Sequence, residues 1–232
     1  SPGVANLIYT ADLPVVINLS TPQDDTPAKY QTITVDVSNT TSVNLVYKVM
    51  FGSEVTVPMY DDGSHGDGSA ADGKYGATIP AQAAGQLVRY KVTASNSNGT
   101  QTMPGYGDTV NYQGYVVQDS SIASQLPVFQ WFMEPSEYTD MVTNHSFDDQ
   151  EFNCIVAYEN TVIDNAGIHV KGQTTRGLVK KPFAITLPQG YKLQIADMTR
   201  PVDEFHLNST YLDSSGVMDI ISWRMAADIG MP

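Results

Sequence analysis

The sequence has one cysteine, few basic residues and no long apolar run. Cys154 is the only cysteine among 232 residues, so no disulfide can form within the chain, and its apolar neighbours predict a buried thiol. No stretch reaches the ~18 apolar residues of a membrane-spanning helix, so we expect no membrane span. Helix-favouring residues are scarce and Thr, Ser, Asn, Val and Tyr recur, which favours a mainly β fold.

Positive charge is the scarcest property of the chain. Its 12 Lys and Arg stand against 25 Asp and Glu, which gives a net charge of −13. Nucleic-acid binding needs a basic face that neutralises phosphates, so this composition excludes it as a general function. An acidic surface instead suits solubility, divalent cations or a salty external medium.

The first half of the chain is typical of a β-sandwich. Short runs alternate apolar and polar residues and are separated by turn sequences, as in sandwiches built from short strands. The candidate strands are residues 32–38, 43–50, 54–59, 75–79 and 87–94. We predict a first domain over residues 1–110, followed by a linker or last strand over 111–125.

The second half mixes strands and helices. Candidate strands are residues 127–133, 151–158, 166–171 and 180–187, and candidate helices are 134–142 and 213–230. Strands followed by a helix that packs on their sheet indicate an α+β domain, which we place over residues 126–232.

An acidic loop separates two of the candidate strands. Residues 61–73 carry four carboxylates and four glycines. Oxygen ligands of this kind suit Ca²⁺, and Asp61, Asp67 and Asp72 are the candidate metal ligands, although the spacing is not that of an EF-hand. The alternative is a tight hairpin connection in which the Asp-Gly pairs only make turns.

A cationic stretch over residues 171–187 reverses the charge of the chain locally. Four of the 12 basic residues, two glycines and two threonines fall between Lys171 and Lys181. Glycines let backbone N–H groups converge on an anion, and the hydroxyls and cations could bind phosphate. The alternative is an ordinary hairpin whose basic residues pair with surface carboxylates. The Gly-Lys-Ser/Thr ending of a Walker A loop is absent.

The first half also resembles a known type of module. The sequence from Asp61 to Pro80, continued by Gly85 to Gly99, is similar to immunoglobulin-like or fibronectin-like modules of bacterial secreted proteins. The resemblance covers roughly residues 14–104. It implies an immunoglobulin-like β-sandwich that serves as a spacer or a presenting arm.

The second half resembles the CotH-type secreted kinases, the spore-coat kinase family. The matching segments follow in the family's order: Leu126-Pro-Val-Phe129, Lys171-Gly-Gln-Thr-Thr-Arg176, Lys180-Lys-Pro-Phe183, Phe205-His-Leu-Asn-Ser209, and the helix from Asp213 to Gly230. The resemblance implies an incomplete atypical-kinase N-terminal lobe, an antiparallel sheet with a helix. It also implies ATP with Mg²⁺ or Mn²⁺ and the phosphorylation of secreted or surface proteins, in an extracellular or cell-surface location.

The resemblance assigns nucleotide-binding roles within the cationic stretch. Lys181 is the preferred phosphate contact because, in an alternating strand, it shares a face with Phe183. Arg176 ranks second, and Asp219 is the candidate carboxylate partner on the helix. The remaining candidates are Lys180, Thr174, Thr175 and Gly172.

The departures from the family narrow this expectation. Lys171 replaces the leading Arg of the turn, residues 173–175 read Gln-Thr-Thr in place of Asn-Ser-Ser, and Met218 stands where the family often has Arg. Nothing matches the metal-binding and catalytic Asp residues of the family's later part, so we expect no catalytic residue here and no activity from this chain alone. The competing hypothesis is a non-catalytic extracellular component with a structural or adhesive role, including self-assembly.

Overall fold

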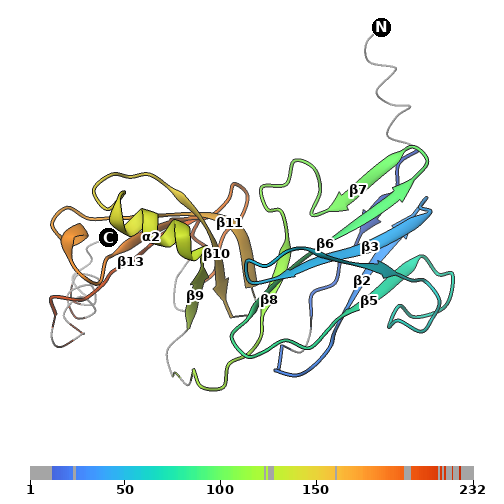
Figure 1. The fold of residues 1–232 in the computed structure, drawn as a ribbon, viewed down its shortest axis with the longest axis horizontal. Coiled ribbons are helices and arrows are strands. Elements are labelled where there is room, and N and C mark those ends of the chain that lie inside the picture. Colours follow the sequence, from blue (N-terminus) through green and yellow to red (C-terminus); the bar gives the residue numbers. More distant parts are fainter. Residues whose placement is uncertain are drawn as a thin grey trace, which may run out of the picture.

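The computed structural model describes residues 12–22, 25–122, 124, 128–159, 161–195, 200–213, 215, 217, 221 and 225. These residues form two β-rich domains that lie next to each other along the long axis of the molecule (Figure 1). No helix in this described part is long and apolar enough to span a membrane.

The first domain consists of two antiparallel sheets. One contains β1 (Val15–Ile17), β2 (Gln31–Ser38) and β5 (Lys74–Ile79), in the order β1-β2-β5. The other has the order β4-β3-β6-β7, with β3 (Ser42–Val49), β4 (Val55–Met59), β6 (Leu87–Asn96) and β7 (Gly99–Met103), and β8 (Gln113–Val116) also pairs with β6. This architecture is consistent with the β-sandwich that the sequence predicts.

The alternation of residues in the strands explains how the two sheets pack. Ile33 and Val35 of β2 are fully buried, and so are Leu45 of β3 and Tyr90 and Val92 of β6. Burying a side chain of this size contributes roughly 1.5–3 kcal/mol. A one-residue slip of a strand would turn its whole apolar face to solvent, so this pattern also fixes the register of the strands.

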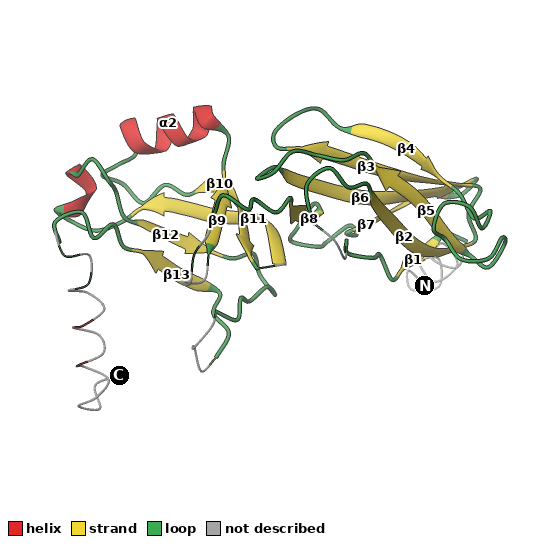
Figure 2. Cartoon of the chain, turned by 90° about the horizontal axis from the view of Figure 1, so that it is seen from below, coloured by secondary structure: helices red, strands yellow, loops and turns green. Residues whose placement is uncertain are grey.

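The second domain is a five-stranded antiparallel sheet with a helix on one face (Figure 2). Its order is β13-β12-β11-β10-β9, formed by β9 (Phe129–Phe132), β10 (Phe152–Tyr158), β11 (Thr161–Val170), β12 (Phe183–Thr186) and β13 (Glu204–Leu207). Helix α2 (Pro135–Thr143) begins with a proline. Proline suits this position because an N–H group in the first turn of a helix has no acceptor within the helix. Its Met141 is fully buried in the domain's core.

The start of strand β12 differs from the sequence prediction, and the second predicted helix is mostly not described by the structure. Strand β12 begins at Phe183, not at Lys180. Lys180 and Lys181 therefore precede the strand, and Pro182 lacks the N–H that a strand interior would use. The helix predicted over 213–230 falls mostly outside the described residues.

The buried thiol that the sequence predicts is confirmed. Cys154 lies in β10 with no exposed surface, packed in the core cluster with Val156 and Ile168. Burial raises the pKa of this thiol to about 12, because a thiolate would lose its hydration there.

The segment between β7 and β8 joins the two domains. Val110 packs in the core of the second domain, whereas Tyr115 of β8 packs in the core of the first. The Thr109 carbonyl accepts a hydrogen bond from the Asn165 amide at 2.8 Å. Both ends of this short segment are thus anchored. The described domains also contact each other directly, because the Arg89 guanidinium of β6 donates to Asp164 of β11.

Candidate ligand site

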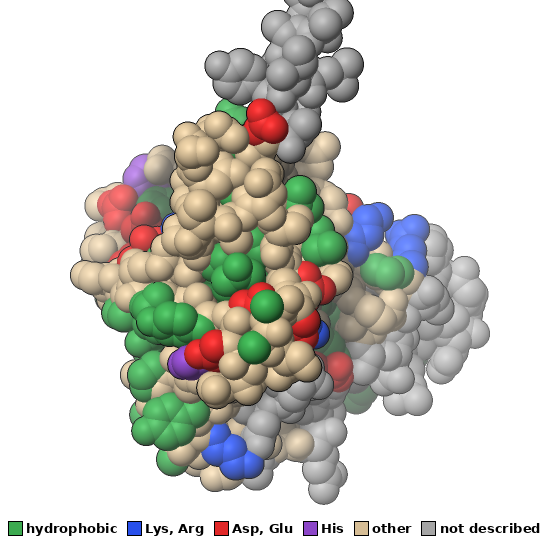
Figure 3. Space-filling model, turned by 90° about the vertical axis from the view of Figure 1, so that its right-hand side faces the viewer, with side chains coloured by type: hydrophobic (Ala, Val, Ile, Leu, Met, Phe, Trp, Pro, Cys, Tyr) green, Lys and Arg blue, Asp and Glu red, His purple; other side chains and the backbone are tan. Residues whose placement is uncertain are grey.

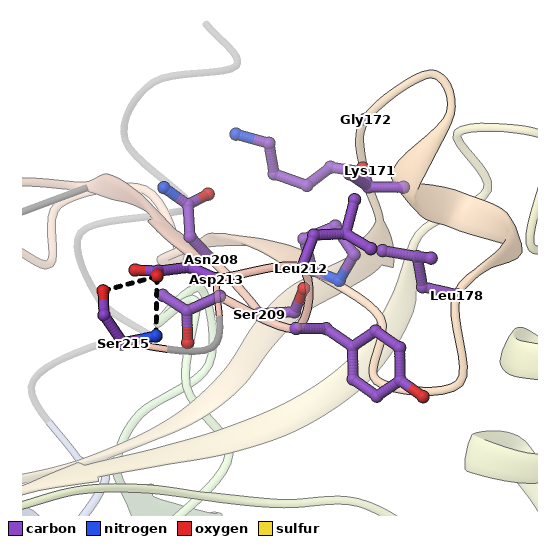
Figure 4. Close-up of a pocket in the computed structure, with 12 residues that line it drawn as sticks. Lys171, Gly172, Leu178, Asn208, Ser209, Leu212, Asp213 and Ser215 are labelled. Carbon is purple, nitrogen blue, oxygen red and sulfur yellow. Dashed lines mark hydrogen bonds between the residues drawn. The ribbon is translucent and has the colours of Figure 1, made fainter. Parts of the chain in front are cut away.

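A cavity of about 640 Å³ opens where the end of β11 faces the segment that follows β13 (Figure 4). Its walls combine one cation, several hydroxyl groups and apolar side chains. The lining residues are Lys171, Gly172, Thr175, Leu178, Pro182, Asn208, Ser209, Thr210, Tyr211, Leu212, Asp213 and Ser215.

The turn after β11 gives one wall of the cavity its shape. Gly172 has a φ of +94°, a conformation that side-chain-bearing residues rarely adopt, and a Cβ there would collide with the side chain of Thr175. Thr175 begins the short 3₁₀ helix η1 (Thr175–Gly177), and its carbonyl accepts the Leu178 N–H at 3.1 Å. Glycine at 172 therefore allows the close turn that lays Thr175 along the cavity.

The Arg176 side chain is engaged within the protein. Its guanidinium donates to the carbonyl oxygen of Asp148 at 2.8 Å, to the Asp149 carboxylate and to the Gly172 carbonyl. The hydrogen bond and charge of Arg176 lower the pKa of the exposed Asp149 carboxyl. In this arrangement Arg176 ties the turn to the loop before β10 and does not line the cavity.

The two adjacent lysines lie beside the cavity. The Lys181 amino group donates to the Arg176 carbonyl at 2.5 Å. Lys180 is exposed, and both lysines line a neighbouring hollow of about 370 Å³. Of the sequence candidates, the structure thus places Gly172 and Thr175 at the main cavity.

The remaining candidates are not brought to the cavity. Thr174 is the exposed N-cap of η1. Asp219 lies outside the described residues. Among the described residues, no carboxylate pairs with Lys181 in the role predicted for Asp219. The Lys181 amino group instead donates to a backbone carbonyl.

The sequence-based prediction did not include three of the residues that line the cavity. Lys171 is half-buried, burial lowers the pKa of its amino group, and the described structure records no hydrogen bond or ion pair for that group. Ser209 is only 7% exposed, and its hydroxyl has no recorded partner in the described part of the chain. Thr210 has a φ of +45°, a left-handed conformation that is strained for a β-branched residue.

A signal for two of these residues was present in the sequence. Lys171 is the first cation of the cationic stretch, and Ser209 ends the Phe205–Ser209 segment. What the sequence could not show is that the other three cations of the stretch face elsewhere.

The cavity suits a ligand with an anionic end and an apolar, planar end. Lys171 and the hydroxyls of Thr175 and Ser209 can bind an anion. Tyr211 and Leu212 are half or more exposed and offer an apolar surface. Asp213, whose carboxylate accepts hydrogen bonds from Ser215, also lines the cavity.

The acidic loop over residues 61–73 differs from the hairpin alternative. Strands β4 and β5 belong to different sheets, so the loop crosses from one sheet to the other, closed by a bridge between Tyr60 and Gly76. Asp67 is fully buried and its carboxylate accepts the N–H groups of Asp62, Gly63 and His65 at 2.7–2.8 Å. These bonds, led by that from Gly63, lower the pKa of Asp67.

The other two candidate calcium ligands also bind backbone N–H groups. Asp61 accepts from residues 72 and 73, and Asp72 accepts from residues 69 and 74. No group of three or more His, Cys, Asp or Glu within the described ranges is arranged to hold a metal ion. Calcium binding here stays a prediction. Figure 3 shows this end of the first domain, with acidic side chains on the face and basic ones mainly toward the rim.

Comparisons with known proteins bear mainly on the first domain. A family model described as "Conditioned medium factor 2nd Ig-like domain" matches residues 4–104. The solved structure titled "Crystal structure of Br derivative BhCBM56" matches with a TM-score of 0.27 and 13% identity, over 45% of this chain and 91% of that one. No curated protein matches this chain. The family match supports an immunoglobulin-like first domain, as the resemblance over residues 14–104 implied.

Proposed function

We propose that the second domain binds ATP, with Mg²⁺ or Mn²⁺, in the cavity around Lys171, as part of a secreted or surface protein kinase of the CotH type. The observation that carries the proposal is that one cavity joins a lysine with no ion pair among the described residues, the hydroxyls of Thr175 and Ser209, and an apolar wall. The chain's order of motifs, from Phe129 to Ser209, supports the same function by resemblance.

The electrostatic setting of Lys171 supports an anionic ligand. The chain has about twice as many carboxylates as cations, yet no carboxylate of the described residues forms an ion pair with this amino group, and the charge of Glu204 only partly offsets its burial. Partial burial penalises its charge, and a bound phosphate would compensate for that loss. The proposal therefore moves the principal phosphate contact from Lys181 to Lys171.

Each wall of the cavity would have its own role in binding. Lys171 pairs with phosphate oxygens, while the turn at Gly172 and the Thr175 hydroxyl donate further hydrogen bonds. Tyr211 packs against the base. Asp213 is the carboxylate that could hold the metal ion, which would neutralise the charge of the phosphates. This chain binds and orients the nucleotide; the proposal assigns it no phosphate transfer of its own.

Calorimetric titration of the whole chain with ATP and MnCl₂ tests the proposal. We expect saturable binding that Lys171→Met weakens at least tenfold. Lys192→Met is the matched control, because Lys192 is an exposed lysine of the same domain that already faces Asp203 at 3.8 Å. Equal affinity in the two variants, or no binding by the wild-type chain, would reject the site.

A non-catalytic structural or adhesive role is the second candidate. It is favoured by the direct contact between the domains, which suits a rigid spacer, and by the match of the first domain to an immunoglobulin-like model. The name of that model, a conditioned medium factor, also supports an extracellular setting. Concentration-dependent self-association in sedimentation experiments, together with no nucleotide binding, would favour this role over the kinase.

A further inference from the structure

Two hollows meet at one pair of aromatic side chains, Trp131 of β9 and Tyr138 of α2. The first hollow, of about 330 Å³, is bounded on its other side by Met50 and Phe51 of the immunoglobulin-like domain. The second, of about 370 Å³, extends past Lys180 to Leu207 of β13. Both hollows are lined by Trp131 and Tyr138, so they adjoin at this ring pair, and we call the two hollows together the junction groove.

The first hollow is lined by apolar and aromatic side chains, and the second combines aromatic rings with polar side chains. The ring centroids of Trp131 and Tyr138 are 5.9 Å apart, and that of Phe183 is 5.4 Å from Trp131. Tyr138 remains 41% exposed although it packs on a tryptophan. Tryptophan and tyrosine are the residues that dominate the energy of protein interfaces, and methionines such as Met50 adapt to varied partners.

One end of the groove is positively charged. Lys180 is exposed, and the described structure records no hydrogen bond or ion pair for its amino group. Lys181 beside it donates to a backbone carbonyl and lines the same end. In a chain of net charge −13, an unpaired lysine next to an apolar groove complements an acidic partner.

We infer that the junction groove binds an extended peptide segment of another protein, with two apolar or aromatic side chains followed by an acidic residue. Side chains on one face of an extended chain recur every second residue, so one could enter each hollow on either side of the Trp131–Tyr138 pair. The acidic residue would then pair with Lys180. This inference does not depend on nucleotide binding in the cavity around Lys171.

The groove exists only while both domains keep their relative position. Met50 and Phe51 come from the turn after β3, whereas Trp131 and Tyr138 belong to the second domain. The Arg89 guanidinium donates to the Met50 carbonyl at 3.0 Å and to Asp164 of β11 at 2.9 Å. One buried side chain thus holds the groove's first-domain wall against the second domain.

Fluorescence anisotropy with a labelled decapeptide tests the inference. The probe carries Phe and Leu two positions apart, followed by two Asp residues, with Ser and Gly elsewhere. Two further probes replace Phe and Leu by Ser, or both Asp by Lys. We expect saturable binding of the first probe only, weakened at least tenfold by Tyr138→Ala and by Lys180→Glu. The control Lys192→Glu should bind like the wild-type chain.

A charge reversal makes the test specific. The Lys180→Glu variant should bind the Lys-containing probe better than the Asp-containing one. A surface that binds peptides only through non-specific apolar contacts would not show this reversal. Equal binding of all three probes, no binding of any, or no effect of Lys180→Glu would overturn the inference. The inference would also be overturned if a neutral oligosaccharide displaced the probe at a concentration lower than that of the unlabelled peptide needed for the same displacement, because the groove would then be a sugar site.

Discussion

Arg89 and Asp164 form a buried ion pair between the two domains, although 75 residues separate them in the chain. The Arg89 Nη1 and Asp164 Oδ1 atoms are 2.9 Å apart, and only 6% and 4% of the side chains are exposed. The second Asp164 oxygen accepts the Asn111 N–H at 3.3 Å. The rings of Phe51 and Tyr112 lie 5.3 and 5.6 Å from the guanidinium carbon. The pair therefore fixes how the domains meet.

Removal of one partner of this pair should destabilise the protein strongly. Asp164→Ala would leave the Arg89 charge buried without a counter-charge, and we expect a loss of about 3–5 kcal/mol in the free energy of unfolding. Urea denaturation followed by circular dichroism measures this loss.

The matched control replaces both charges by apolar residues. Arg89→Met combined with Asp164→Leu removes the desolvation cost together with the attraction, so its stability should lie well above that of Asp164→Ala. Equal destabilisation in the single and double variants would show that the contact acts through shape and not through charge.

The two domains also pack closely against each other at Gly114. A Cβ at this position would lie 2.8 Å from the Val88 carbonyl oxygen and 3.0 Å from the Val162 side chain of the second domain. Gly114→Ala should therefore cost about 1–3 kcal/mol through overpacking. Gly177→Ala, where nothing lies within 4 Å of the new Cβ, should change stability by less than about 0.5 kcal/mol in the same denaturation experiment.

The buried Asp67 carboxylate should make the acidic loop sensitive to low pH. Its pKa is lowered by backbone N–H bonds, so its contribution to stability is present above the ordinary pKa of about 3.9 and is lost as pH falls through the lower folded value. Asp67→Asn should lower the Tm at pH 7, and the difference from wild type should shrink below about pH 4.

Thermal unfolding monitored by circular dichroism at several pH values checks this effect. Asp203→Asn serves as a control, because Asp203 is 67% exposed and makes only a long contact with Lys192. A Tm difference for Asp67→Asn that stays constant down to pH 2 would contradict the role assigned to the carboxylate.

Cys154 should be unreactive in the folded protein. Its pKa is raised to about 12, so the buried protonated thiol adds stability fully below the ordinary pKa of about 8.5, and this is lost as pH rises toward 12. At pH 8 we expect a disulfide reagent such as dithionitrobenzoate to react at least 100-fold more slowly with the native protein than in urea. A fast native reaction would mean that β10 opens readily.

The sequence predicts local structure well where residue alternation is strong. The periodicity over 32–38 and 87–94 corresponds to β2 and β6, because apolar residues at every second position can be buried in one register only. It predicts the start of β12 less well, since Lys180 and Lys181 continue an apparent strand that Pro182 interrupts.

The candidate site is predicted only in part. The sequence identified the turn at Gly172, because a glycine among cations and hydroxyls has a local signature. It preferred Lys181 and Arg176 as phosphate contacts, whereas the structure directs their donors to carbonyl oxygens and to Asp149 and leaves Lys171 at the cavity. The direction of a long flexible side chain depends on partners that are distant in sequence.

By itself, the sequence determined the β-rich character, the immunoglobulin-like first domain, the buried Cys154 and the location of the cationic stretch. The β-rich character, the buried thiol and the cationic stretch follow from composition and from short-range periodicity, whereas the immunoglobulin-like type of the first domain is what its resemblance to known modules implies. Only the tertiary structure decided that Arg89 pairs with Asp164, that the acidic loop crosses between sheets, and that residues of both domains line one groove. Each of these depends on contacts between segments far apart in the chain, for which no local pattern of residues exists.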